Sequence, residues 1–192
     1  MSKLRVVYSA DRIGERLKEI SAEIAKDYVD RELVLVGMLK GAAFFLADLA
    51  RLIARPVDYE FVSVTSSIGA HGEVVSLTFA TQVDVSDRHV LVLKDVFHSG
   101  VTENYLITHL SQQNPASIEV AALVDKPQLR SVNLSARYAV FDDAPDGFLV
   151  GYGFMPRQPP KSTPLPFPPH VQIPIIRLPD PHRTPPAVAA GF

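Results

Sequence analysis

The pattern of apolar and polar positions divides the first 154 residues into segments of two kinds. In one kind, apolar side chains recur every three or four residues, which is typical of an amphipathic helix. In the other, apolar residues follow one another or alternate with polar ones, which is typical of strands. Residues 9–11 (SAD) supply an N-cap for the first helix. The predicted helices cover residues 13–25, 41–54 and 102–112, and the predicted strands cover residues 32–37, 57–65, 73–81, 89–93, 117–123, 138–141 and 148–152.

The alternation of strands with helices predicts an α/β domain built on a mainly parallel sheet. Residues 32–37 (ELVLVG) and 89–93 (HVLVL) are short, continuous apolar runs, as expected for strands buried on both faces. Parallel sheets bind their ligands beyond the carboxyl ends of their strands. The loops that follow these two runs are therefore the first places to look for a functional site.

Proline marks a change in composition near residue 154. Twelve of the 16 prolines fall within residues 155–192. Because proline fixes φ and has no amide hydrogen, this region is expected to form no long helix and no central strand. A short strand-like stretch covers residues 171–176. The predicted organisation is one domain over residues 1–154 and an extended tail over residues 155–192, which packs on the domain or a neighbouring subunit, binds an SH3-type partner or is partly disordered.

Charge and composition exclude several classes of function. Nineteen basic and 21 acidic residues give a net charge of -2, which provides no reason to expect a nucleic acid or a membrane as partner. The chain has no cysteine, which excludes disulfides, thiolate nucleophiles and Cys-ligated zinc. No apolar run approaches the roughly 20 residues of a membrane span, and the N-terminus does not have the pattern of a secretory signal. A cytoplasmic protein is therefore expected.

The segment after the second apolar run, residues 94–102 (KDVFHSGVT), leads from a strand into a helix. Unpaired amides at a helix N-terminus favour a phosphate, the hydroxyls of Ser99 and Thr102 add donors, and Gly100 permits close approach of the backbone. Asp95 offers a carboxylate for ribose hydroxyls or a magnesium ion. Spacing alone slightly favours a different interpretation, in which Ser99 or Thr102 simply caps a strand-to-helix turn.

Residues 94–102 resemble the phosphoribosyl diphosphate signature of type I phosphoribosyltransferases. Within that group, the closest resemblance is to the hypoxanthine (hypoxanthine–guanine) phosphoribosyltransferase family, and it covers about residues 5–154. It implies a twisted, mainly parallel sheet with flanking helices and a small hood, built from the N-terminal segment and residues 126–154. Four further motifs occur in the order of that family: residues 33–42 (LVLVGMLKGA) are similar to its pyrophosphate loop, residues 45–49 (FLADL) to the helix behind that loop, residues 123–127 (LVDKP) to its purine-reading segment and residues 145–153 (PDGFLVGYG) to its hood.

The resemblance implies a reaction in which a 6-oxopurine, hypoxanthine or guanine, displaces pyrophosphate from phosphoribosyl diphosphate. It also implies Mg²⁺ as cofactor and assembly into a homodimer or homotetramer. Asp95 would bind ribose hydroxyls and metal, and Lys126 would donate to the purine 6-oxo group. The other positions that the resemblance implies are Lys40 and Gly41 for pyrophosphate, His98, Ser99, Gly100, Val101 and Thr102 for the 5′-phosphate, Phe148 for stacking on the purine and the Leu149 backbone for its edge.

Four departures from the family pattern fall at functional positions. Lys94 stands where the family has Glu, so one carboxylate has become a cation. His98 stands where the family has the Asp that handles a purine proton, although a histidine can also exchange a proton near neutral pH. Met155 stands at a magnesium-binding Asp and is a poor ligand for that ion. The loop at residues 64–72 is shorter than the family's mobile loop and has no tyrosine.

These departures leave two functions open. In the first, the protein is a purine phosphoribosyltransferase whose catalytic residues are His98 and Asp95. In the second, it is a non-catalytic sensor or regulator that binds a nucleotide on the same fold, with Lys94 paired to a ligand phosphate. The other histidines show no metal-ligand spacing, and the chain has neither a nucleophile elbow nor a Walker-type loop.

Overall fold

The computed structural model describes residues 5–69, 72–80, 84–145, 147, 149–154 and 175–177. Phe148, Met155 and most of the predicted tail lie outside the described residues. No helix in the described part of the chain is long and apolar enough to cross a membrane. In chain order the elements are β1 (Arg5–Tyr8), α1 (Ala10–Asp27), β2 (Leu33–Leu39), α2 (Ala43–Leu52), β3 (Asp58–Gly69), β4 (Gly72–Phe79), β5 (His89–Phe97), α3 (Val101–Ser111), β6 (Ser117–Asp125), the short 3₁₀ helix η1 (Pro127–Leu129), β7 (Tyr138–Phe141), β8 (Leu149–Val150) and β9 (Ile175–Arg177).

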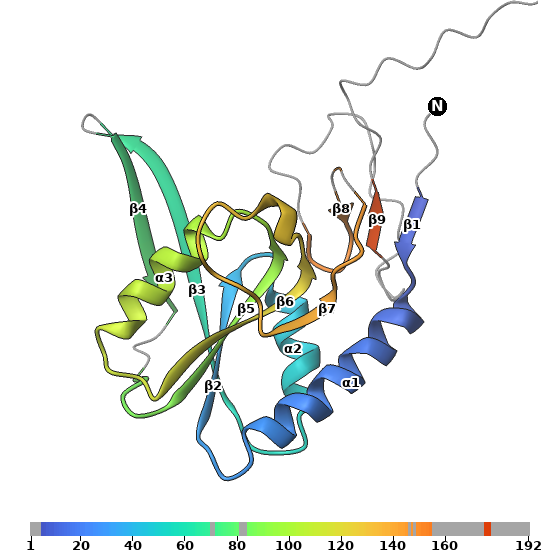
Figure 1. Cartoon of the computed structure of the whole chain (residues 1–192), viewed down its shortest axis with the longest axis horizontal. Coiled ribbons are helices and arrows are strands. Elements are labelled where there is room, and N and C mark those ends of the chain that lie inside the picture. Colours follow the sequence, from blue (N-terminus) through green and yellow to red (C-terminus); the bar gives the residue numbers. More distant parts are fainter. Residues whose placement is uncertain are drawn as a thin grey trace, which may run out of the picture.

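A six-stranded sheet forms the centre of the fold, with the strand order β4-β3-β2-β5-β6-β7 (Figure 1). Strands β3, β2, β5, β6 and β7 are parallel, and the edge strand β4 runs antiparallel to β3. The two continuous apolar runs of the sequence are β2 and β5, which pair in the middle of the sheet with Leu35 opposite Leu91. This topology confirms the predicted α/β fold with a mainly parallel sheet.

Alternate side chains of the central strands face two different helical layers. Leu35 of β2 belongs to the core that also contains the buried residues of α1 and α2. Val36 belongs instead to the core beneath α3. Helices α1 and α2 thus lie on one side of the sheet and α3 on the other (Figure 1). The N-cap prediction is confirmed, because Ser9 Oγ accepts a hydrogen bond from the Arg12 amide at 3.2 Å.

The β3–β4 hairpin is longer than the sequence predicts. Its strands pair continuously from Val62 opposite Phe79 to Gly69 opposite Gly72. The strand predicted over residues 57–65 is confirmed from residue 58 on, and the expectation of a loop between it and the next strand is wrong for residues 66–69 and for residue 72. Antiparallel pairing satisfies the backbone hydrogen bonds of this segment, although its Ser and Gly residues do not form the alternating pattern of a strand.

A second sheet contains three strands in the order β1-β9-β8, and β9 is antiparallel to both neighbours (Figure 1). The expectation that the proline-rich region contributes no central strand is wrong for β9. This strand contains no proline, so its backbone keeps the amide hydrogens that a central position requires. Ile175 is completely buried and packs in the same core as Tyr8, which ties this late segment to the first strand.

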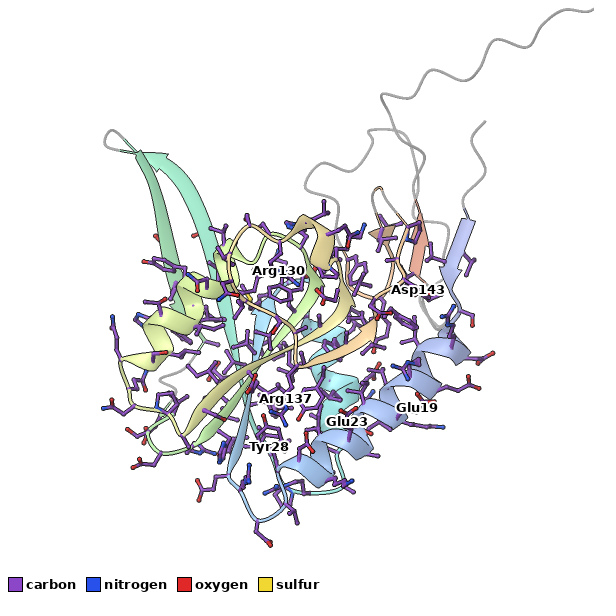
Figure 2. The ribbon with its side chains drawn as sticks, in the orientation of Figure 1. Glu19, Glu23, Tyr28, Arg130, Arg137 and Asp143 are labelled. Carbon is purple, nitrogen blue, oxygen red and sulfur yellow. The ribbon has the colours of Figure 1, made fainter. Side chains whose placement is uncertain are left out.

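Asp27, the last residue of α1, connects that helix to β7. Its Oδ2 accepts hydrogen bonds from Arg137 Nη2 at 2.9 Å and from the Tyr138 hydroxyl at 2.8 Å. Figure 2 shows Arg137 near Tyr28, at the C-terminal end of α1. The Arg137 hydrogen bond, followed by that of Tyr138, lowers the pKa of the Asp27 carboxyl below its ordinary value of 3.8. The stability that this group contributes is therefore present above the ordinary pKa and is lost as the pH falls through the lower, folded value.

We expect Asp27→Asn to lower the free energy of unfolding by about 1 kcal/mol at pH 7, because two hydrogen bonds to a charged acceptor are weakened. The difference from the wild type shrinks as the pH falls from the ordinary pKa of 3.8 through the lower, folded pKa of Asp27. Urea unfolding at pH 7 and at a series of acidic pH values measures both effects. Asp30→Asn is the matched control, since Asp30 is exposed and its φ of 56° suits asparagine. Equal stability of Asp27→Asn and wild type at pH 7 would contradict the prediction.

Candidate functional site

Three loops meet at the carboxyl ends of the neighbouring strands β2, β5 and β6. Lys40 and Gly41 follow β2, residues 98–100 follow β5, and Lys126 follows β6. Because β5 lies between β2 and β6, its loop is flanked by the other two. The Lys126 amide donates a hydrogen bond to the Phe97 carbonyl at 2.9 Å, which joins the loops of β5 and β6 directly. The structure thus places the segments predicted to bind pyrophosphate, phosphate and purine at one edge of the sheet.

Gly41 lies directly against the carboxylate of Asp95. A Cβ atom at Gly41 would overlap Asp95 Oδ2 and the carboxyl carbon, and would lie 2.9 Å from Asp95 Cβ. Gly153, with a φ of 87°, approaches from the segment after β8, where an added Cβ would lie 3.0 Å from the Gly41 carbonyl oxygen. Two other segments, β5 and the segment after β8, therefore approach Gly41, and the absence of a side chain at Gly41 and at Gly153 permits these contacts.

Helix α3 begins without a side-chain cap. Its N-cap is Gly100, whose φ of 79° is left-handed and which makes no side-chain hydrogen bond to the first turn. The interpretation in which Ser99 or Thr102 caps the turn is therefore wrong. A Cβ at Gly100 would lie 2.8 Å from Val132 Cγ2 and 3.2 Å from Arg130 Cδ. Glycine is needed here for conformation and for space, and no side chain caps the amides of the first turn.

Arg130, labelled in Figure 2, contacts the backbone of the β5 loop. Its Nη1 donates to the His98 carbonyl at 2.7 Å, and its guanidinium carbon lies 3.4 Å from the centre of the Phe97 ring. The same guanidinium pairs with the carboxylate of Asp125, and both side chains are close to 90% buried, with 11% and 12% exposed. The next residue, Ser131, donates its amide to the Ser99 carbonyl at 3.0 Å. The loop after β6 therefore holds the backbone of the β5 loop in place.

The side chain of His98 is exposed, and its ring is turned back onto its own loop. His98 Nδ1 accepts a hydrogen bond from the Ser99 amide at 2.6 Å. Nδ1 therefore acts as a hydrogen-bond acceptor in this arrangement. The Ser99 amide is also one of the donors that a phosphate at this loop would use, so the ring and a phosphate compete for it.

Lys94 lies between two carboxylates. Its Nζ is 2.9 Å from Asp95 Oδ1 and 3.7 Å from Oε1 of Glu103, in the first turn of α3. Burial alone would lower the pKa of the Lys94 ammonium, but the charges of Asp95 and Glu103 outweigh it and raise that pKa. Lys94 is therefore held in its charged form. The pairing suggested by the sensor interpretation, with a ligand phosphate, differs from the one observed, which is with two side chains of the protein.

Residues 123–127, predicted to read the purine, also contact the segment before β8. Lys126 is only 5% exposed, and its Nζ donates to the Pro145 carbonyl at 3.0 Å. Leu149 lies in β8, buried, with its Cα opposite that of Arg177 in β9. The Tyr152 hydroxyl donates to Asp48 of α2, and burial, followed by this contact, raises the pKa of Tyr152 and keeps it protonated. These contacts tie the segment around β8 to α2 and to the loop of β6.

Comparison with known proteins agrees with this geometry. Residues 7–154 match the family model described as the phosphoribosyl transferase domain. The chain belongs to the phosphoribosyl transferase domain family.

Among relatives, the chain is 36% identical over 156 residues to a hypoxanthine-guanine phosphoribosyltransferase of Mycobacterium avium, an alignment that covers 77% of this chain and 76% of the relative. It is 35% identical over 151 residues to the enzyme of the same name from Streptococcus pneumoniae, with 78% and 83% covered. Among solved structures, a hypoxanthine-guanine phosphoribosyltransferase from Bacillus anthracis superposes with a TM-score of 0.77 at 29% identity, covering 92% of this chain and 99% of that one.

The donor set of this phosphoribosyl transferase does not fit a resident magnesium ion at Asp95. The described residues contain no group of three or more His, Asp or Glu side chains that could hold a metal. Of the two Asp95 oxygens, Oδ1 faces the Lys94 ammonium and Oδ2 faces Gly41. Magnesium prefers near-ideal octahedral oxygen coordination, and the Lys94 ammonium at 2.9 Å from Oδ1 competes with such an ion for this carboxylate.

Sequence reasoning missed two side chains of this site, Glu103 and Arg130. Both carry a charge and both are largely buried, which is rare for charged residues unless they are paired. Glu103 follows Thr102 in the predicted helix, and its position in the first turn resembles an ordinary favourable interaction with the helix dipole. No local pattern indicates that its partner is Lys94 at the end of the preceding strand.

Proposed function

We propose that this protein transfers the phosphoribosyl group of phosphoribosyl diphosphate to a 6-oxopurine, with release of pyrophosphate. The observation that carries the proposal is the contact of Gly41 with Asp95, beside the uncapped N-terminus of α3. This contact supports the proposal because it brings the carboxylate proposed for ribose close to the loop proposed for pyrophosphate, at the end of the strand that leads into α3. The names of the relatives support hypoxanthine and guanine as the acceptors, and they favour transfer over a non-catalytic sensor.

In this proposal each loop takes one part of the substrates. Residues 98–102 bind the 5′-phosphate through the amides of α3 and the hydroxyls of Ser99 and Thr102. Lys40, which is exposed, and the Gly41 backbone face the pyrophosphate. Asp95 accepts from the ribose hydroxyls. On the purine side, Lys126 reaches the 6-oxo group, the Leu149 backbone contacts the edge of the base and Phe148, outside the described residues, stacks on the ring.

The proposed reaction releases one proton from the purine, and a base must accept it. The bond from C1′ to the pyrophosphate oxygen breaks while a bond from C1′ to the purine nitrogen forms, and the purine gives up a proton. When a phosphate takes the Ser99 amide, His98 Nδ1 loses its donor and becomes free to accept that proton. Phosphate binding thus prepares the base. Positioning of the two substrates supplies most of the remaining rate enhancement.

In this proposal magnesium arrives bound to phosphoribosyl diphosphate, where it neutralises the pyrophosphate oxygens. The surroundings of Asp95 give no reason to place it on the protein's carboxylates. Family resemblance also supports assembly of the chain into a homodimer or homotetramer.

The proposal predicts that purified protein with Mg²⁺, phosphoribosyl diphosphate and hypoxanthine or guanine produces the corresponding nucleoside monophosphate. His98→Ala is expected to lower kcat by about 100-fold, as is typical for loss of a general base. His109→Ala is the matched control, because His109 is exposed and lies toward the far end of α3. Chromatographic detection of nucleotide product measures both rates. Absence of product with every 6-oxopurine would refute transfer, and nucleotide binding without turnover would instead support the sensor.

A further inference from the structure

The Lys94 side chain is largely buried, which is unusual for a lysine. Only 23% of the side chain is exposed, and the Asp95 and Glu103 side chains around it are 19% and 4% exposed. A carboxylate buried as deeply as Glu103 requires a compensating charge, since an unpaired buried charge costs several kcal/mol. Lys94 supplies that charge, and at the same time it reaches Asp95, the carboxylate that contacts Gly41. Glu103 therefore helps to hold the ammonium beside Asp95, the carboxylate proposed to bind ribose.

This arrangement changes the electrostatics that a polyanionic substrate meets. Phosphoribosyl diphosphate brings several negative charges to a site that contains the Asp95 carboxylate, and the two would repel each other without an intervening cation. A divalent ion is one solution to that repulsion. A lysine fixed at 2.9 Å from Asp95 Oδ1 is another, because it places a positive charge at the same carboxylate without any exchangeable ligand.

We propose that Lys94, fixed by Glu103, is a built-in counter-ion that takes the place of a divalent metal at Asp95, so that phosphoribosyl diphosphate binds without one. The inference rests on the proposed function for the identity of the ligand. It concerns a different property, namely the source of the positive charge beside Asp95. The same role explains both Lys94, at the first position of the signature, and its buried partner Glu103.

The first test uses the metal ion alone. Titration of wild-type protein with Mn²⁺, followed by the electron paramagnetic resonance signal of the free ion, is expected to show no site that depends on Asp95. Lys94→Gln leaves the Asp95 and Glu103 carboxylates around the space of the lost ammonium, and this variant is expected to gain one Mn²⁺ site. Lys94→Gln/Glu103→Gln is expected to lose the gained site. Mn²⁺ binding by the wild type that disappears in Asp95→Asn would overturn the inference.

The second test measures phosphoribosyl diphosphate binding by calorimetry, in EDTA and in Mg²⁺. The wild type is expected to bind in both buffers. In EDTA, Lys94→Gln is expected to bind at least about tenfold more weakly, the usual loss for one charged contact, and Mg²⁺ is expected to restore its affinity. Equal binding by Lys94→Gln and wild type in EDTA, or wild-type binding only in Mg²⁺, would overturn the inference.

Controls separate this inference from folding effects and from the proposed function. Lys18→Gln, an exposed position on α1, is the matched lysine control and should bind as the wild type does. If Lys94→Gln does not fold because Glu103 is left unpaired, the double variant removes both charges and carries the same expected loss in EDTA. Binding in EDTA without transfer to any purine refutes only the proposed function. If the wild type catalyses phosphoribosyl transfer but binds phosphoribosyl diphosphate only in Mg²⁺, the role of Lys94 as counter-ion is refuted and the proposed function is not.

Discussion

Gly41→Ala is expected to lower the rate of phosphoribosyl transfer by about 100-fold or more, because displacements of about 1 Å at a reacting centre have effects of that size. The added methyl group would occupy the position of Asp95 Oδ2 and would also crowd Asp95 Cβ at 2.9 Å. Either the loop after β2 or the Asp95 side chain must move. Both movements separate the carboxylate from the pyrophosphate loop. Steady-state kinetics, with nucleotide product as the readout, measures the loss.

Gly14→Ala provides the matched control for that variant. Gly14 lies within α1, and a Cβ added there would meet nothing within 4 Å. Alanine is favoured over glycine inside a helix by roughly 1 kcal/mol, so this variant should be slightly more stable and fully active. Circular dichroism of both variants checks that the sheet is intact. A Gly41→Ala protein with wild-type kinetics would show that the contact with Asp95 is not needed for the reaction.

Arg130→Met is expected to have the largest effect on stability, a loss of about 3 kcal/mol or more. The substitution leaves the Asp125 carboxylate buried without its ionic partner. It also removes the donor to the His98 carbonyl and the cation over the Phe97 ring. Urea unfolding measures the change in free energy. Because the β5 loop loses its support, the affinity for phosphoribosyl diphosphate should fall as well.

Two further variants separate the causes of that loss. Arg130→Met/Asp125→Asn removes both charges and should recover much of the stability, since replacing a whole buried pair is far less costly than breaking it. Arg51→Met breaks the pair with Asp48 on α2, where the arginine side chain is 74% exposed, and should change stability by less than about 1 kcal/mol. The explanation is wrong if the single and double Arg130 variants are equally unstable.

The sequence predicts the scaffold well because the scaffold is specified by local patterns. Continuous apolar runs identify β2 and β5, which are buried on both faces, and periodic apolar residues after Ser9 identify α1. The boundaries are less well predicted. Helix α2 begins at Ala43 rather than at residue 41, because Gly41 belongs to the loop that approaches Asp95. Pairing between strands likewise extends β3 to Gly69 beyond any pattern in its side chains.

The contacts within the site are less predictable, since they depend on where loops distant in the sequence lie in space. Asp95 and Gly41 can each be named from the motifs, but their contact follows only from the pairing of β2 with β5. The roles of Glu103 and Arg130 depend on packing against Lys94 and Asp125. Charged residues at such positions look like solvent-exposed ones in a sequence, and only their burial distinguishes them.

The middle place of β9 in the small sheet has a consequence for biosynthesis. Strand β1 is made first, yet its hydrogen-bonding neighbour is β9, the last strand among the residues that the structure describes. During translation the six-stranded sheet can assemble while β1 and β8 still lack the strand that joins them. The small sheet can therefore form only after the segment that contains Ile175 has been synthesised. A nascent chain that stops before that point would leave the edges of β1 and β8 that pair with β9 open.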